Sequence, residues 1–426
     1  MEKSSLSLAR SRRLFRSIVA VSALVAIVAT CQAGPLGSPG MGSLEPQGSR
    51  SPSVPASPLA SPTAAVSLAE SPSPVPSLAP GWERHTVQTG LDAPLTRVAW
   101  TGTRFLAVDA VGGSLLDSTD GRTWHQQPRL ADGSVGMVAV GPGRVLAVGT
   151  ANVPGSVVAI WHSTDGLNWS ATPDGASLHG RDGAFITMAA VVPAGDGWLA
   201  VGGEQLMCAP GPCLVRAVVW ASPDGLQWTR RADTAALQDA EMTGVVRTQA
   251  GYVAVGDAAV DPSLPDSAIR PAIWTSPDGR TWTRSDRLPV VTAAKDADVV
   301  LDSVAVTGSR VVAVGHGTQG NGWVDAFAWW NEGGTWSAVE IGRFFPSQGV
   351  KVAAVPGGLL AMFVTGDDKT CPRAIWSSAD GSSWGCIGND PAFAGSTISD
   401  APVAPAVEVL VGYGTVGAVV WTAAPH

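Results

Sequence analysis

The chain has 426 residues, of which 15% are charged and 45% are hydrophobic, and its 17 Trp far outnumber its 2 Tyr. A chain that is disordered over its whole length is rich in charged residues and poor in aromatic ones. This composition therefore excludes a wholly disordered chain. Lys and Arg number 27 against 35 Asp and Glu, which gives a net charge of −8. That balance argues against a nucleic-acid-binding protein, because such a protein needs a basic face. The five Cys and six His lack metal-ligand spacing, so we expect neither a metal site nor a cofactor.

Residues 1–31 are expected to be an export signal. A basic start, from Lys3 to Arg16, precedes the uncharged and mostly apolar stretch 17–30. This stretch of about 14 residues is too short for a stable membrane-spanning helix, which needs roughly 20. Residues 11–15 (Ser-Arg-Arg-Leu-Phe) resemble the bacterial twin-arginine export motif, and an ordinary secretory signal with a dense basic start is the alternative.

The signal ends in Val-Ala-Thr-Cys31, which resembles the lipobox of bacterial lipoproteins. The resemblance implies that Cys31 is lipidated and anchors the exported protein to the outer face of the cell membrane; a soluble secreted protein is the alternative. Residues 32–80 follow as a tether, with 11 Pro and 11 Ser between positions 35 and 80. Such a composition cannot form a core and is typical of a semi-rigid, disordered spacer.

A seven-residue motif, Ser-x-Asp-Gly-x-x-Trp, recurs along the remaining chain. Its Asp and Trp positions are Asp120 and Trp124, Asp165 and Trp169, Asp224 and Trp228, Asp278 and Trp282, and Asp380 and Trp384. A degenerate copy spans 330–336. The Ser and Asp side chains can bond to nearby backbone N–H groups and close a turn, for which Gly supplies a positive φ.

The motif resembles the Asp box of sialidases and related β-propellers. That resemblance implies that each copy joins the third and fourth strands of a blade. A Trp usually stands two residues before the Ser, and an apolar run ending in Ala-Val-Gly lies upstream, so each unit holds four short strands. The final unit lacks a fourth strand, whereas residues 81–87 resemble the segment that follows a motif, with Trp82 in the place of its Trp. We therefore predict one all-β domain at 81–426, a seven-bladed β-propeller of four-stranded blades whose N-terminal strand completes the last blade.

Four cysteines are left for the exported domain. Cys371 and Cys386 flank one motif hairpin, and Cys208 and Cys213 bracket a Pro-Gly loop. Both pairs are expected to form disulfides, which oxidising compartments favour. A four-Cys metal site would need Cys-x-x-Cys spacing, which is absent.

The sialidase resemblance implies an arginine triad, a Tyr nucleophile with a Glu partner and an acid–base Asp. Neither Tyr fits that role, because Tyr252 lies inside a repeat strand and no Glu is placed to activate Tyr413. An Arg-Leu-Pro match exists at 287–289, but it follows four copies of the motif rather than preceding the first. No catalytic residue is assigned.

The long loops of the middle blades carry more acidic than basic residues, which suggests either a rim for a cationic partner or solubilising charge. The candidate rim residues are Asp182, Asp239, Glu241, Asp298, Trp323 and Trp330. The two Trp are not explained by the repeat, and core filling is the alternative for them. We expect a monomeric, non-catalytic lipoprotein that binds protein or glycan through its loops and contacts the membrane only by its lipid. A divergent glycoside hydrolase and a purely structural envelope component are the alternatives.

Overall fold

A computed structural model describes residues 81–87, 93–111, 113–195, 197–205, 215–261, 268–285, 288–289, 298–318, 324–344, 347–365, 371–402, 407–415 and 417–423. The predicted export signal, Cys31 and the tether lie outside these residues. Among the described residues there is no helix with the length and apolarity needed to cross a membrane.

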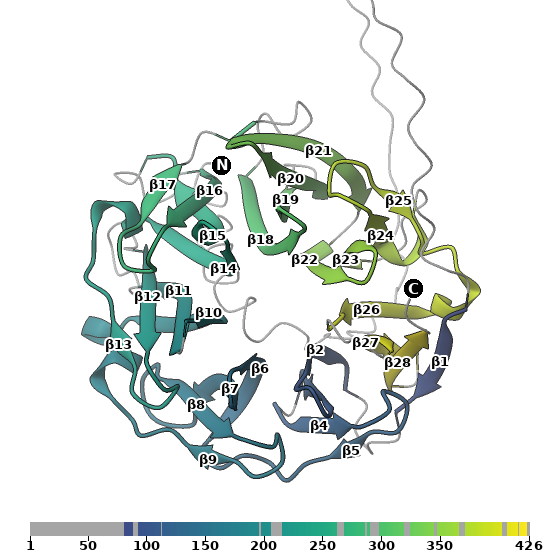
Figure 1. Cartoon of the computed structure of the whole chain (residues 1–426), viewed down its shortest axis with the longest axis horizontal. Helices are drawn as coiled ribbons and strands as arrows, with labels where there is room; N and C mark the ends of the chain where they lie inside the picture. Colours follow the sequence, from purple (N-terminus) through teal and green to yellow (C-terminus); the bar gives the residue numbers. More distant parts are fainter. Residues whose placement is uncertain are drawn as a thin grey trace, which may run out of the picture. The chain divides into compact units, whose positions relative to one another are not determined.

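The described strands form seven antiparallel sheets of four strands each, arranged as blades around a centre (Figure 1). The predicted seven-bladed propeller is therefore confirmed. Blade 1 holds β2 (Leu95–Trp100), β3 (Phe105–Asp109), β4 (Leu115–Ser118) and β5 (His125–Gln126). Blade 2 holds β6 (Gly133–Gly141), β7 (Arg144–Ala151), β8 (Val158–Ser163) and β9 (Ser170–Ala171). Blade 3 holds β10 (Phe185–Ala194), β11 (Gly197–Gln205), β12 (Val215–Ser222) and β13 (Thr229–Arg230).

The remaining blades repeat this order from the centre outwards. Blade 4 holds β14 (Ala240–Thr248), β15 (Gly251–Ala259), β16 (Ile269–Ser276) and β17 (Thr283–Ser285). Blade 5 holds β18 (Asp298–Thr307), β19 (Arg310–Thr318), β20 (Val324–Glu332) and β21 (Thr335–Phe344). Blade 6 holds β22 (Ser347–Val355), β23 (Gly358–Thr365), β24 (Ile375–Ser378) and β25 (Gly385–Cys386). Blade 7 holds β26 (Ser396–Asp400), β27 (Glu408–Gly414), β28 (Gly417–Ala423) and β1 (Glu83–Thr86). Short 3₁₀ turns lie between them: η1 (Ala176–Leu178), η2 (Arg181–Gly183), η3 (Ala235–Leu237), η5 (Pro372–Ala374) and η6 (Pro391–Phe393).

The ring is closed by pairing between the two ends of the domain. β1 pairs antiparallel with β28, from Glu83 opposite Thr422 to Thr86 opposite Val419. Trp82 packs on Phe393 in the cluster between blades 6 and 7, with ring centroids 5.9 Å apart. The predicted completion of the last blade by the N-terminal strand is confirmed.

Every innermost strand carries a β-bulge at the equivalent place, for example between Val135 and Met137 in β6 and between Met242 and Gly244 in β14. The Gly of the recurrent Ala-Val-Gly run lies opposite the bulge in five blades. A Cβ on Gly149, Gly202, Gly256, Gly315 or Gly412 would stand 1.8–2.0 Å from a carbonyl oxygen of the innermost strand. The close approach of two backbones therefore requires glycine there.

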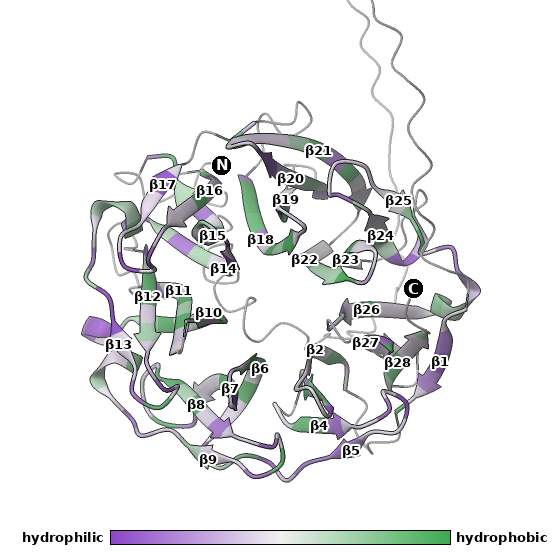
Figure 2. Cartoon of the chain, in the orientation of Figure 1, coloured by the Kyte–Doolittle hydropathy of each residue, from purple (hydrophilic) through white to green (hydrophobic). Residues whose placement is uncertain are grey.

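The core consists of one apolar cluster between each pair of neighbouring blades. Hydrophobic residues follow the strands, and hydrophilic ones concentrate at the outer turns (Figure 2). The clusters differ in size: thirteen described residues are buried between blades 2 and 3, but five between blades 1 and 2. The interface between the first two blades is therefore the less filled of the two.

The Ser-x-Asp-Gly-x-x-Trp motif forms the turn between the third and fourth strands. In blade 3, Ser222 Oγ accepts a hydrogen bond from Gly225 N (2.8 Å), and Asp224 Oδ1 accepts from the backbone N of Leu226 and Gln227. Gly225 has a φ of +77°. Trp228 Nε1 donates to Gly225 O at 3.1 Å, so the indole seals the turn. The backbone donors around the Asp carboxylates help to hold their pKa values below the usual range, as at Asp278.

The degenerate copy in blade 5 forms a different turn from the one expected. Glu332 pairs with Thr335, and Gly333 and Gly334 both have positive φ, as in a two-residue hairpin. Trp329 takes the place of the Trp that precedes the motif, is 2% exposed and donates to Pro289 O. Trp330 lies near the end of β20, far along the strand from the preceding loop, and packs half-buried on the cluster between blades 5 and 6. Trp330 is therefore a packing residue rather than a member of the loop rim.

Cys371 and Cys386 form a disulfide with Cα atoms 5.5 Å apart. Cys386 lies in β25, opposite Trp376, whereas Cys371 precedes η5 in the loop before β24. The other predicted pair, Cys208 and Cys213, lies outside the described residues.

Candidate functional site: the loop face

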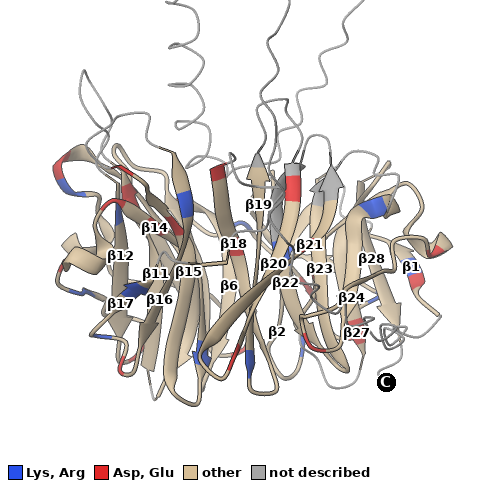
Figure 3. Ribbon diagram, turned by 90° about the horizontal axis from the view of Figure 1, so that it is seen from above, with Lys and Arg blue, Asp and Glu red and all other residues tan. Residues whose placement is uncertain are grey.

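One rim of the ring carries the loops that join second to third strands and those that lead from each blade to the next. Within the described residues this rim, here called the loop face, consists of 87, 93–94, 110–111, 113–114, 127–132, 152–157, 172–184, 231–239, 260–261, 268, 288–289, 371–374, 387–395 and 415. The motif turns form the opposite rim. Figure 3 views the ring from its side and shows Asp and Glu at several places along its upper rim.

A buried carboxylate organises the loop face of blade 3. Glu204, near the end of β11, is 4% exposed. Its oxygens accept hydrogen bonds from Arg181 N, Nε and Nη2 (2.7–3.1 Å) and from both Nη atoms of Arg230 (2.6 and 3.0 Å). Arg181 Nη1 also donates to Asp233 at 2.7 Å. Burial would raise the pKa of Glu204, but the Arg230 and Arg181 bonds outweigh it and lower the pKa to about 2.

This network fixes the two loops on either side of blade 3. Arg181 belongs to η2 in the loop before β10, and Arg230 ends β13. Because both guanidinium groups are bound to Glu204, they are committed to structure rather than to an incoming carboxylate. Sequence reasoning missed this network, since Glu204 is more than twenty residues from either arginine and carries no motif.

Two of the predicted rim residues stand at positions where the backbone φ is positive. Asp182 (φ +53°) and Asp239 (φ +54°) adopt the left-handed region, which Asp tolerates better than most residues. Asp239 O accepts a hydrogen bond from Ala259 N at 2.9 Å, which ties its loop to the next strand pair. Asp182 is exposed. Asp298 Oδ1 accepts from Ile269 N at 3.0 Å and so links blade 5 to blade 4. Trp323 lies outside the described residues.

Glu241, the remaining predicted rim residue, stands on the innermost strand of blade 4. It pairs across the sheet with Asp257 of β15, so two acidic side chains occupy the same face. Glu241 is half-buried, and a Cβ on Gly203 of blade 3 would lie 2.8 Å from its Cγ. Burial and, second, the Asp257 charge raise the pKa of Glu241 to about 8, so this carboxyl holds a proton at neutral pH.

Two more polar contacts lie on inner strands. His316 Nδ1 is 2.6 Å from Asp302 Oδ2, within blade 5. Lys351 pairs with Asp400, whose other oxygen accepts from Val98 N at 2.9 Å, so that blades 6, 7 and 1 are joined. Burial lowers the pKa of Lys351 to about 8, against the opposing effect of Asp400.

The described residues contain no group of three His, Cys, Asp or Glu side chains placed to hold a metal ion. The two Tyr occupy repeat strands: Tyr252 is half-buried beside the cluster between blades 3 and 4, and Tyr413 pairs with Thr397 and Ala418 in blade 7. The loop face thus brings acidic and structural side chains together, without an assembled nucleophile and base among the residues described.

No family model matches this chain, and no curated protein matches it. Solved structures do resemble its fold. An α-L-arabinanase from Penicillium chrysogenum complexed with arabinobiose is 11% identical, with 66% of this chain and 90% of that chain covered and a TM-score of 0.40. The SapL1 lectin complexed with α-methyl fucoside is 18% identical, with 70% and 96% covered and a TM-score of 0.40. The β-propeller domain of a Pyrococcus furiosus protease is 10% identical, with 76% and 93% covered and a TM-score of 0.44. At these identities the likeness concerns the fold alone.

Proposed function

We propose that this protein is a non-catalytic binding module, exported and held at the outer face of the membrane by a lipid on Cys31. The motif turns support a relationship with Asp-box propellers such as the sialidases, in which this turn joins the same two strands. The loop face would then be presented to a protein or glycan at the end of the Pro/Ser-rich tether.

The observation that carries the proposal is where apolar side chains are exposed. Among the described residues four large apolar side chains are exposed, and three of them stand on the loop face: Val111 (61%), Val153 (47%) and Val260 (48%). They lie on the loops of blades 1, 2 and 4, and the described loop face as a whole carries more Asp than Arg. Exposed apolar side chains that gather on one face supply the apolar part of a protein–protein contact. A partner with basic and apolar residues fits this face best.

The test replaces the three valines together by Ser and compares the variant with the wild type. Each tagged protein is cross-linked on cells that produce it, and the captured proteins are quantified by mass spectrometry. We expect a discrete partner to be lost with the triple variant. A matched variant on the opposite rim, Thr123→Ala with Gln227→Ala, should retain it. Equal capture by both variants would exclude the loop face as the binding surface.

A glycoside hydrolase is the second candidate, and one observation favours it. Glu241, whose pKa is raised to about 8, lies across the strand pair from Asp257, and glycoside hydrolysis uses two carboxyl groups, of which the general acid has a raised pKa. Fluorogenic glycosides test this directly. Turnover that disappears in Glu241→Gln, with the fold intact by circular dichroism, would establish it; absence of turnover across the panel would leave the binding module.

A further inference from the structure

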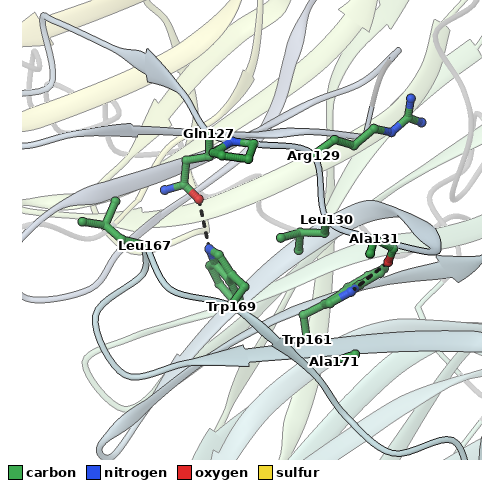
Figure 4. Close-up of a pocket in the computed structure, with 9 residues that line it drawn as sticks. Gln127, Arg129, Leu130, Ala131, Trp161, Leu167, Trp169 and Ala171 are labelled. Carbon is green, nitrogen blue, oxygen red and sulfur yellow. Dashed lines mark hydrogen bonds between the residues drawn. The ribbon is translucent and has the colours of Figure 1, made fainter.

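A cavity lies between the first two blades, at the outer part of the ring, and residues 127–131 of the loop face form part of its lining. Its volume is about 260 Å³, below the roughly 300–1,000 Å³ of sites for drug-sized ligands. Trp161, Trp169, Leu130 and Leu167 contribute most of its apolar wall (Figure 4). Leu167 is 42% exposed and is the fourth exposed apolar side chain of the described residues.

The cavity lies beside a short inter-blade loop. Six residues, 127–132, lead from β5 to β6. The corresponding connections before blades 3, 4 and 7 are longer, at thirteen, nine and nine residues, and each contains a 3₁₀ turn. The connection before blade 2 is too short for that turn.

In blades 3, 4 and 7 the corresponding volume is filled. η1 lies between the two Trp of blade 3: Trp220 Nε1 donates to Ser177 O at 2.7 Å, and Ser177 Oγ donates to Trp228 O. Leu178 of η1 is 3% exposed and belongs to the cluster that holds both Trp. Leu237 of η3 and Phe393 of η6 cover Trp274 and Trp421 in the same way. In blade 2 the equivalent Trp161 donates to Ala131 O at 3.2 Å, but no 3₁₀ turn stands between it and Trp169.

The motif of blade 2 is adjusted around the cavity. Trp169 Nε1 donates to Gln127 Oε1 at 2.9 Å, and Gln127 Nε2 donates to Gly166 O at 2.8 Å. In blades 1, 3 and 6 the motif indole itself donates to the equivalent Gly carbonyl. The buried Gln127 side chain therefore holds Trp169 in a turned position (Figure 4). The wall is preformed, and its indole N–H groups are already satisfied, so it offers apolar surface to an occupant.

The three filled blades also show which charge accompanies the apolar side chain. Asp174 and Asp233 precede Leu178 and Leu237 by four residues, and Asp390 precedes Phe393 by three. On the rim of the cavity, Arg129 is exposed, points away from the cavity centre, and makes no hydrogen bond or ion pair with the described residues (Figure 4). An acidic residue three or four positions before the apolar one would meet this guanidinium, which gives the cavity and such a turn complementary charge.

We propose that this cavity binds a short turn of a partner polypeptide in which an Asp or Glu precedes a Leu or Phe by three or four residues. The apolar side chain enters between Trp161 and Trp169, and the carboxylate pairs with Arg129. The three loop-face valines are not among the residues that line this cavity, although residues 127–131 of the loop face are.

The chain supplies its own probe. The heptapeptide Ala-Asp-Thr-Ala-Ala-Leu-Gln, which is residues 232–238, carries the turn that fills blade 4. Its fluorescein-labelled, capped form is titrated with the full chain, and binding is followed by fluorescence anisotropy. We expect Leu167→Ala, and Ala171→Leu, which narrows the cavity, each to weaken binding about tenfold. Arg129→Glu should weaken it about two- to fivefold, as for an exposed ion pair, and a peptide with Lys in place of its Asp should restore the affinity of that variant.

Leu226→Ala is the matched control, because Leu226 holds the position of Leu167 in blade 3, where η1 fills the space. It should bind the peptide as the wild type does, as should the triple valine variant of the loop face. No binding at millimolar protein, binding that survives both cavity variants, or equal binding of a Leu→Ser peptide would overturn the proposal. Displacement of the peptide by methyl glucoside or methyl galactoside would also overturn it, in favour of a sugar site.

Discussion

The second and third blades carry the same motif and the same preceding Trp, and their four strands pair in the same order. In blade 3 the connection that enters the blade folds into η1, and the motif Trp228 is buried. In blade 2 that connection is shorter, Trp169 is half-buried, and a cavity remains. The repeat thus determines strands and turns, whereas the connections between blades determine what each blade presents to solvent.

Replacing the Trp of the two blades should show the largest difference. We expect Trp228→Ala to lower the free energy of unfolding by about 3–5 kcal/mol, since a buried indole leaves a cavity in a packed cluster. Trp169→Ala should lower it by about 1 kcal/mol, because its indole already borders open volume. Urea unfolding followed by circular dichroism measures both. Equal losses would mean that the outer edge of blade 2 is as tightly packed as that of blade 3.

Of blades 2 and 3, only blade 3 contains the Glu204 network. Glu204→Gln removes the carboxylate that Arg181 and Arg230 share and leaves Asp233 as the ion-pair partner of Arg181, and we expect the free energy of unfolding to fall by about 3 kcal/mol. Because the pKa of Glu204 is lowered to about 2, its contribution is present above the ordinary Glu pKa and disappears as pH falls from about 4.5 towards 2. Melting temperatures between pH 2 and 6 should therefore converge for wild type and variant at the acid end. A constant gap would contradict the ion network.

Glu241 should show the opposite pH dependence. Its pKa is raised to about 8, so the folded state holds a proton that the unfolded chain releases near pH 4.5. The free energy of unfolding is then expected to fall as pH rises from about 4.5 to 8 and to level off above. Glu241→Gln should flatten this dependence, and Asp257→Asn should reduce it by removing the second cause. Urea midpoints at several pH values between 4.5 and 9 measure the slope.

The smallest expected effect is at Gln127. Among the described motif turns, only the turn of blade 2 has a glutamine that bridges the motif indole and the Gly carbonyl. Gln127→Leu removes the acceptor of Trp169 Nε1 and the donor to Gly166 O, at a cost of about 1 kcal/mol. The indole should then turn towards the Gly166 carbonyl, as Trp228 does in blade 3. ¹⁹F NMR of 5-fluorotryptophan-labelled protein, with Trp169→Phe to assign the signal, detects the movement. An unshifted signal would show that Gln127 does not hold the indole.

The sequence predicted the architecture well because the local chemistry is repeated. The Ser, Asp and Gly of each motif form hydrogen bonds within a few residues, so a pattern of seven letters is enough to place a turn. Ring closure followed from the unmatched strand at each end, and Trp82 marked it. The Gly of the Ala-Val-Gly run was recognised as part of a strand, but its physical reason, the facing bulge, depends on a neighbouring strand.

The candidate site was harder to predict because its contacts are distant in sequence. Asp182 and Asp239 were selected for their charge, yet their backbone conformation explains them, and a positive φ leaves no clear sequence signal at a non-glycine residue. The repeat did not explain Trp330 because the degenerate copy is shifted by one residue. Trp329 occupies the position of the Trp that precedes the motif, and Trp330 follows it in the same strand. The cavity did have a signal: the spacing between Trp124 and Trp169 is the shortest between successive motif Trp, but spacing alone does not say what a missing turn uncovers.

The closing blade has a mechanical consequence. Because β1 is the outermost strand of blade 7, tension transmitted from residues before Glu83 acts first on its four residue pairs with β28. Arg84, which donates to Ala394 O, and the tilted ring contact of Trp82 with Phe393 share that load. A pull strong enough to peel β1 away would open the ring at one seam while six blades keep all four strands. The β1–β28 pairing is thus the part of the domain that would yield first to force applied from its N-terminal side.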